Sequence, residues 1–229
     1  MFRIIALLGI LYTGVFAHQI VAKPLGKNKY EIAFWTHDGF EKYKPEQLLS
    51  IGAYGSDLSP IKAGVDYHKN ALVLTEKTPF IMTAIFDAGY WVETHKGFVK
   101  GDRMSAKGIV FGSLHSIKIT KTLFSWNDSM SKPVGQEYEI VPLKNPFILK
   151  IGDTLPVLVL ENGKPAVGVS MEIANHDELQ IKTDNQGKVL IPIKNKGLQI
   201  IAGGFEKTLF DDPKATTLFI QSSLTFELK

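Results

Sequence analysis

The chain has 229 residues, 45% of them hydrophobic and 10% aromatic, which is enough to build packed cores and excludes a wholly disordered protein. Its formal net charge of +3 is dispersed, without a run of basic residues, and this argues against a nucleic-acid partner. The chain contains no cysteine, which excludes disulfides, thiolate metal sites and cysteine nucleophiles. Any metal ligand must therefore be a histidine, carboxylate, methionine, amide or terminal amine.

The first 17 residues have the pattern of a secretory signal peptide. A short positive start, Met1–Arg3, precedes an almost wholly apolar run over residues 4–16, and the small residues Val15 and Ala17 fit a cleavage site. The apolar run is shorter than the ~20 residues of a membrane span. We expect cleavage after Ala17, which gives a periplasmic mature protein that begins at His18 and has no transmembrane segment.

A histidine at the mature N-terminus has chelating chemistry. The free α-amine and the Nδ1 atom of the same residue can close a six-membered ring on one metal ion, and such nitrogen donors suit nickel, copper, zinc and cobalt. An unblocked amine titrates near about 7.7–8.0, so a metal can displace its proton at neutral pH. The alternative is that His18 is simply the first residue of a secreted strand.

Short apolar segments separated by turn residues predict strands through the first half of the chain. Residues 43–50 have helical or irregular character, and Asp66–Asn70 is polar and loop-like. The expected strands are Ile20–Ala22, Tyr30–Trp35, Ile51–Ser59, Ala71–Leu74, Pro79–Phe86, residues 90–95 and His115–Thr120.

The polar segment Asn127–Pro133 predicts a linker, and about seven more short strands follow it. Asn162-Gly163 is a hairpin turn, because this pair adopts positive φ at low cost. Strands at this spacing predict an all-β protein of two β-sandwich domains, immunoglobulin-like or transthyretin-like, over residues 18–130 and 136–229. The strands are Glu137–Pro142, Leu155–Leu160, Val167–Ala174, Leu179–Lys182, residues 189–193, Gly197–Ala202, Thr216–Gln221 and Leu224–Leu228.

Four side chains could assist His18 in holding a metal ion. They are His37, His95, Glu93 and His115. Alternation along a strand predicts that Glu93 and His95 share one face with Trp91, so that Glu93 could bind the metal or orient the imidazole. His115 has the parity of Ile117 and Ile119 and is expected to point inward. Each histidine could equally be an ordinary strand-end residue, and surface positions are expected for His68 and His176.

No motif of a known catalytic class is present. The chain lacks G-x-S-x-G, H-E-x-x-H and a glycine-rich phosphate loop, and the adjacent carboxylates Asp211 and Asp212 would point apart. We therefore expect no enzymatic activity. Trp91 and Trp126 are expected in the core or at a domain interface, although exposed tryptophans would suit a carbohydrate-binding module.

Several segments together resemble the exported domain-of-unknown-function family linked with bacterial nickel and cobalt uptake. The second half alone is less specific, because similar turns recur in transthyretin-like and carboxypeptidase-regulatory-like β-domains. The segments that carry the resemblance are Ala17-His18, Trp35–Phe40, Gly89–Thr94, Tyr138–Leu143, Asn145-Pro146, Gly152-Asp153, Asn162–Val169 and Thr183–Val189.

The resemblance implies a periplasmic, metal-binding accessory protein, without enzymatic activity, that serves a membrane metal transporter. It implies His18 and then His37 as ligands, whereas His95, Glu93 and His115 are candidates on local chemistry alone. Similar proteins often carry a histidine near the final strand, and Phe219–Leu228 has none. The alternative is a cell-envelope β-module that binds carbohydrate or protein without metal, or serves a structural role.

Overall fold

The computed structural model describes residues 18–36, 39–67, 71–173 and 177–229. Within these residues the protein is all-β, as predicted, with three 3₁₀ turns and no α-helix. The predicted signal peptide, His37, His68 and His176 lie outside the described residues. The 3₁₀ turns are η1 (Pro45–Gln47), η2 (Asp128–Ser131) and η3 (Pro146–Ile148).

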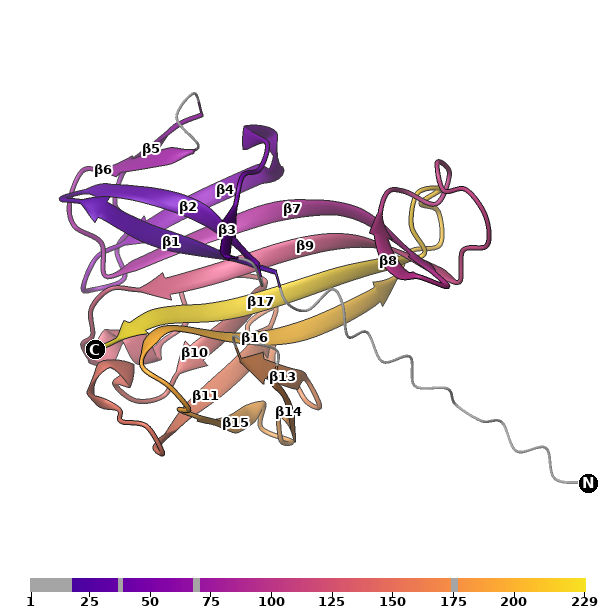
Figure 1. Ribbon diagram of the computed structural model, residues 1–229. Coiled ribbons are helices and arrows are strands. Elements are labelled where there is room, and N and C mark those ends of the chain that lie inside the picture. Colours follow the sequence, from indigo (N-terminus) through magenta and orange to yellow (C-terminus); the bar gives the residue numbers. More distant parts are fainter. Residues whose placement is uncertain (1–17, 37–38, 68–70, 174–176) are drawn as a thin grey trace, which may run out of the picture.

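Three sheets stack into layers, as Figure 1 shows. The N-terminal sheet comprises β1 (Gln19–Gly26), β2 (Lys29–Thr36), β3 (Gly39–Glu41), β5 (Ala63–Asp66) and β6 (Leu72–Thr75). The C-terminal sheet comprises β10 (Tyr138–Pro142), β11 (Thr154–Glu161), β12 (Lys164–Pro165) and β15 (Lys188–Pro192). The central sheet comprises β4 (Leu48–Tyr54), β7 (Ile81–Thr94), β8 (Gly97–Lys100), β9 (Gly112–Leu123), β13 (Ser170–Ile173), β14 (Asp177–Lys182), β16 (Gly197–Thr208) and β17 (Thr217–Leu228).

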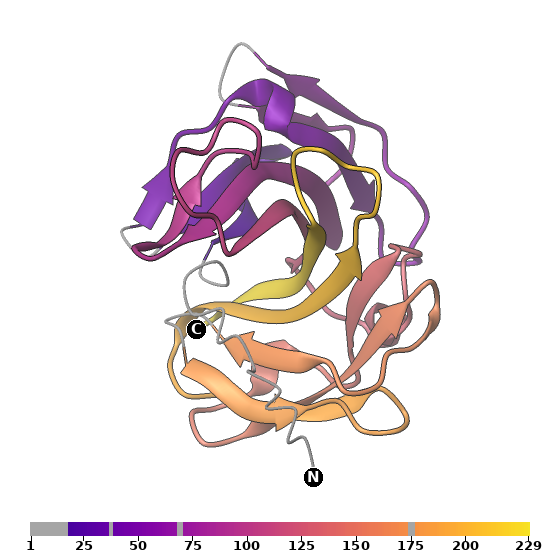
Figure 2. The ribbon, with the colours of Figure 1, turned by 90° about the vertical axis from the view of Figure 1, so that its right-hand side faces the viewer.

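The central sheet runs through both halves of the chain. Strand β17, the last strand, pairs in parallel with β9, where Gln221 lies opposite Lys118. The strands on either side of the predicted linker are therefore hydrogen-bonded in one sheet, and Figure 2 shows the other two sheets above and below it. The division into domains 18–130 and 136–229 stays a prediction from the sequence.

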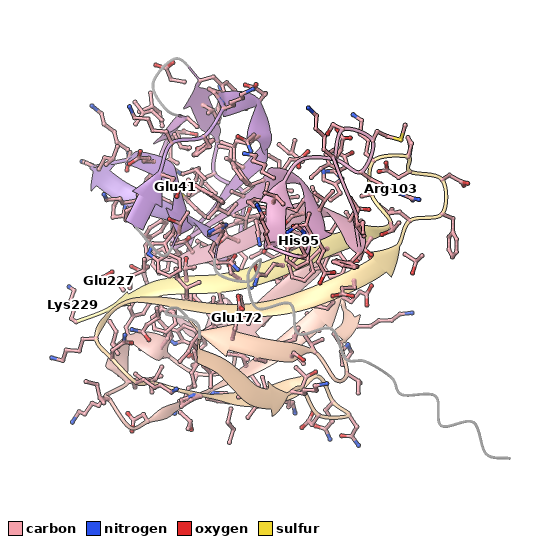
Figure 3. The ribbon with its side chains drawn as sticks, turned by 45° about the vertical axis from the view of Figure 1, so that its right-hand side comes forward. Glu41, His95, Arg103, Glu172, Glu227 and Lys229 are labelled. Atoms are coloured by element: carbon pink, nitrogen blue, oxygen red, sulfur yellow. The ribbon has the colours of Figure 1, made fainter. Side chains whose placement is uncertain are left out.

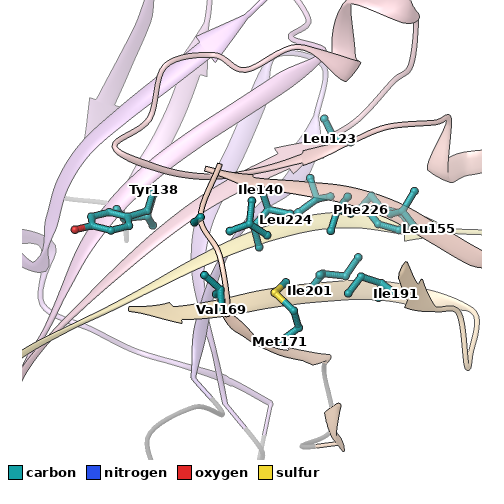
Figure 4. Close-up of a cluster of buried hydrophobic side chains, with 14 of the residues drawn as sticks. Leu123, Tyr138, Ile140, Leu155, Val169, Met171, Ile191, Ile201, Leu224 and Phe226 are labelled. Atoms are coloured by element: carbon teal, nitrogen blue, oxygen red, sulfur yellow. The ribbon is translucent and has the colours of Figure 1, made fainter. Parts of the chain in front are cut away.

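Alternation along β9 and β17 sends apolar side chains into the core beneath the central sheet. Ile119 and Leu123 of β9 and Leu224 of β17 pack there against the C-terminal sheet. Figure 4 shows this cluster, in which Ile140 and Leu155 belong to β10 and β11. Their nearly complete burial is the main source of stability for this half, at about 25 cal/mol per Å² of apolar surface.

A second core lies between the N-terminal sheet and the other face of the central sheet. Ile20 and Ile32 of the N-terminal sheet meet Met82, Ala84 and Phe86 of β7. The even-numbered residues of β7 therefore face this core up to a β-bulge between Asp87 and Gly89. The bulge reverses the alternation, so that Trp91, opposite Leu114, shares the face that Phe86 occupies before it.

Several predicted boundaries were wrong. The predicted strands Pro79–Phe86 and 90–95 are parts of one strand, β7, which runs from Ile81 to Thr94, because the bulge lets the chain continue in the same ladder. The two predicted segments 216–221 and 224–228 are likewise one strand, β17. The expected helical or irregular stretch 43–50 contains only the turn η1 before β4 begins at Leu48.

Candidate functional site

Strand β1 lies beside two candidate binding regions of the protein. His18 precedes its first residue, and a groove lies along its later residues Val21–Pro24. Because Gln19 pairs with Trp35, β1 begins where β2 ends, one residue before the undescribed His37. The cleavage site predicted from the sequence therefore falls next to a structured strand, and a free amine at His18 would be held near the protein surface.

His18 is half-buried between aromatic rings. Its imidazole lies 5.6 Å, centroid to centroid, from Phe34 of β2 in an edge-on arrangement, and 6.2 Å from Trp91 of β7. Trp91 packs with Leu114, Phe98 and Phe219 on the face of the central sheet that also carries Lys118. These contacts fix the ring of His18 beside the boundary between the two halves of the chain.

The structure does not bring all the predicted ligands to His18. His115 and Leu114 are neighbours on β9 and therefore point to opposite faces, so His115 lies on the far side of the central sheet from His18. There its Nε2 atom is 2.8 Å from Oδ1 of Asp87, and its ring stacks on Tyr90 at 4.4 Å. His115 is thus committed to a local pair.

The expectation that His95 shares a strand face with Glu93 was wrong. β7 ends at Thr94, which pairs with Gly97, so His95 and Lys96 form an exposed two-residue turn, and His95 is labelled in Figure 3. Glu93 does share the Trp91 face. Its Oε2 atom lies over Gly112, 3.2 Å from the position a Cβ would take there.

Among the described residues no group of three or more histidines and acids is placed to hold a metal ion. The donors that the structure puts on the sheet face at the start of β1 are the imidazole of His18 and the carboxylate of Glu93. A second nitrogen would come from the α-amine of His18 if the chain is cleaved after Ala17, as the sequence predicts.

A row of buried polar side chains crosses the same face, and sequence reasoning missed it. It comprises three cross-strand pairs of β9 and β17. Lys118 donates to Gln221 Oε1 at 2.6 Å, the hydroxyls of Thr120 and Ser223 are 3.1 Å apart, and those of Thr122 and Thr225 are 2.7 Å apart. The available sequence signal was the high content of serine and threonine in the segments that form β9 and β17. We call these six residues the polar row.

The polar row begins at a charged cluster and ends at the groove. Gln221 donates to Glu172 of β13, and burial lowers the pKa of Lys118 from 10.5 to about 8. At the other end Thr122 accepts a hydrogen bond from the Ala22 N–H at 3.1 Å, which ties β1 to the central sheet. The polar row therefore connects Glu172 of β13 at one end with β1 at the other.

The groove has a volume of about 860 Å³ and lies between β1, β9, β16 and β17. Such a volume falls within the roughly 300–1,000 Å³ of small-molecule sites. Aromatic side chains dominate its walls, and Glu227 and Lys229 at its rim are labelled in Figure 3. The aromatic lining residues are Phe40, Phe124, Trp126, Phe147 and Phe226.

Comparison with known proteins identifies a family. A family model described as "Domain of unknown function (DUF4198)" matches residues 15–206. A Haemophilus influenzae protein, described only as an uncharacterized protein, is 22% identical over 223 residues, covering 97% of this chain and 94% of that relative. No solved structure matches. No helix among residues 18–36, 39–67, 71–173 and 177–229 has the length and apolar character of a membrane span. The chain belongs to the DUF4198 domain family.

Proposed function

We propose that this protein is an exported, periplasmic binding protein that captures a divalent transition-metal ion through the α-amine and imidazole of His18. Nickel and cobalt are favoured over copper and zinc by the resemblance to proteins linked with nickel and cobalt uptake. The metal is cargo for a membrane transporter, and the protein has no enzymatic activity. Residues 136–229 serve as a transthyretin-like supporting domain.

One observation carries this proposal: His18 immediately precedes strand β1 and lies against rings from two sheets. A terminal chelate on a flexible tail would lose conformational entropy on binding, whereas this imidazole is already positioned. Glu93, on the face that Trp91 occupies, is the described carboxylate best placed to add an oxygen ligand or an acceptor for the imidazole N–H. His37 stays a proposed ligand from the sequence.

Calorimetric titration of the mature protein with nickel, cobalt, copper and zinc tests the proposal. His18→Ala should weaken binding by roughly 100-fold, because it removes the imidazole and with it the chelate ring. His115→Ala is the matched control and should leave affinity unchanged, since His115 faces the other side of the sheet. Equal affinity of wild type and His18→Ala for all four metals would refute the assignment.

A second candidate function rests on the groove. Trp126 lines it together with Phe124 and Phe226, and a sugar ring can stack on such aromatic faces. In this alternative the protein is an envelope module that binds carbohydrate or an apolar segment of a protein, without metal. Quenching of tryptophan fluorescence by oligosaccharides, lost in Trp126→Ala but kept in Trp91→Ala, would favour it. Trp91 packs beside His18 and does not line the groove.

A further inference from the structure

Two loops form a protruding tip at one end of the protein. Residues 101–111 connect β8 to β9, and residues 209–216 connect β16 to β17. The Arg103 N–H donates to the Lys214 carbonyl at 2.9 Å and the Thr216 N–H to the Ser113 carbonyl at 3.1 Å, so the loops are joined. Figures 1 and 2 show both loops projecting in the same direction. We call these two loops the loop tip.

The loop tip exposes apolar side chains that the fold does not need there. Phe210 is 90% exposed, Ile109 74%, Met104 73% and Phe111 64%. The first three are the most exposed large apolar side chains among the described residues. Single exposed apolar residues need no explanation, but four on two joined loops form a patch of the kind that marks a protein or membrane contact.

The loop tip itself has balanced charges, Arg103, Lys107 and Lys214 against Asp102, Asp211 and Asp212, and the adjoining hairpin supplies an excess of cations. Residues 95–111 carry the four cations Lys96, Lys100, Arg103 and Lys107, all exposed, and one acid, Asp102. Asp102 accepts a hydrogen bond from the Ser105 N–H at 2.8 Å, so its carboxylate is engaged in a turn. The second loop adds Lys214, Asp211 and Asp212, and Asp212 likewise accepts from the Lys214 N–H at 2.7 Å. The two segments together retain a net positive charge.

We propose that the loop tip docks on an anionic lipid surface, with Phe210, Ile109 and Met104 inserted at the headgroup boundary and the lysines and arginine against the phosphates. The apolar side chains stand on convex loop ends. A bilayer interface accepts protruding apolar side chains without a complementary surface, whereas a protein partner needs a surface shaped to receive them. The cations match the negative headgroups. This proposal does not depend on metal binding at His18.

Flotation with lipid vesicles tests the proposal on the mature protein. The protein should float with vesicles of phosphatidylcholine and phosphatidylglycerol and bind roughly tenfold less to phosphatidylcholine alone. A variant with Met104→Ser, Ile109→Ser, Phe111→Ser and Phe210→Ser should lose flotation on both. Because all four side chains are exposed, its thermal midpoint should stay that of wild type, and this measurement confirms that it is folded.

A matched control and a charge variant complete the test. Ile148→Ser/Leu190→Ser removes side chains that are 71% and 60% exposed elsewhere and should float as wild type does. Lys100→Gln/Arg103→Gln/Lys107→Gln should keep weak binding but lose the preference for phosphatidylglycerol. The proposal is overturned if wild type does not float, or if the fourfold serine variant floats equally. Self-association that this variant abolishes, without flotation of wild type, would also overturn it and assign the tip to a second copy.

Discussion

The two faces of the central sheet each bury one lysine of β9, and the two lysines have different partners. Lys121 points toward the C-terminal sheet, where it is in contact with the carboxylate of Glu139. That carboxylate also accepts from the backbone N–H groups of Val134, Gly135 and Gln136 at 2.7, 3.0 and 3.1 Å. Lys118, three residues earlier on the opposite face, donates to the neutral side chain of Gln221, which in turn donates to Glu172.

The difference lies in the groups that contact each buried lysine. Around Lys121 the charges are satisfied at close range by the chain's own groups, as a buried ion pair requires. The Tyr138 hydroxyl on the Lys121 side is buried without a hydrogen-bond partner, and so are the Ser116 hydroxyl and the Gln19 side-chain amide on the Lys118 side. His18 lies on this second face.

The largest expected loss of stability comes from removing the carboxylate that pairs with Lys121. Glu139→Ala leaves Lys121 as an uncompensated buried charge and frees three backbone N–H groups. It should lower the free energy of unfolding by about 3–5 kcal/mol, measured by urea denaturation. Glu137→Ala, whose exposed carboxylate is 3.4 Å from Lys207, is the control and should cost less than about 0.5 kcal/mol. Equal effects would remove the distinction between the faces.

Lys118 should instead affect the pH dependence of stability. Its pKa is about 8 in the folded protein and 10.5 ordinarily, so between these values the unfolded chain binds the extra proton. Stability should therefore rise with pH through this window, by up to roughly 3 kcal/mol. Lys118→Met removes the titrating group, so the stability of wild type minus that of the variant should rise between pH 8 and 10.5. A constant difference would mean that Lys118 titrates normally.

A smaller effect is expected within the polar row. Thr122→Val removes the acceptor of the Ala22 N–H and the partner of the Thr225 hydroxyl. Both groups would then be buried and unpaired, and the free energy of unfolding should fall by about 1–3 kcal/mol. Thr208→Val, at an exposed position in β16, should be nearly neutral in the same denaturation experiment. A neutral Thr122→Val would show that water replaces these bonds.

The smallest effect is expected at the half-exposed pair of His115 and Asp87. Its side chains are 21% and 33% exposed, so solvent screens the interaction. His115→Asn should lower the free energy of unfolding by less than about 1 kcal/mol and leave metal affinity unchanged. A loss of metal binding would place the metal on the His115 face and contradict the separation of the two faces.

The sequence predicted local features better than long-range ones. The Asn162-Gly163 turn has the positive φ values of 51° and 73° that this pair favours, and the alternation of β-branched residues predicted the all-β class. The signal-like segment pointed to His18, which lies directly before strand β1. These features depend on neighbouring residues, so the sequence pattern is sufficient to find them.

Features that depend on distant pairings could not be predicted. Alternation shows which side chains of β9 share a face, but not that β17, about 100 residues later, lies beside it. The bulge at Asp87–Gly89 reverses the facing of Trp91 and Glu93 without a sequence signature strong enough to locate it. The polar row and the loop tip both arise from such pairings.

The most direct test of the proposed function adds a single glycine before His18 of the mature protein. This extension keeps every side chain and moves only the free α-amine, which breaks the six-membered chelate ring. Calorimetric titration with nickel at neutral pH should show roughly 100-fold weaker binding for the extended protein than for the protein that begins at His18. Equal affinity of the two proteins would contradict the claim that the mature N-terminus is the metal site.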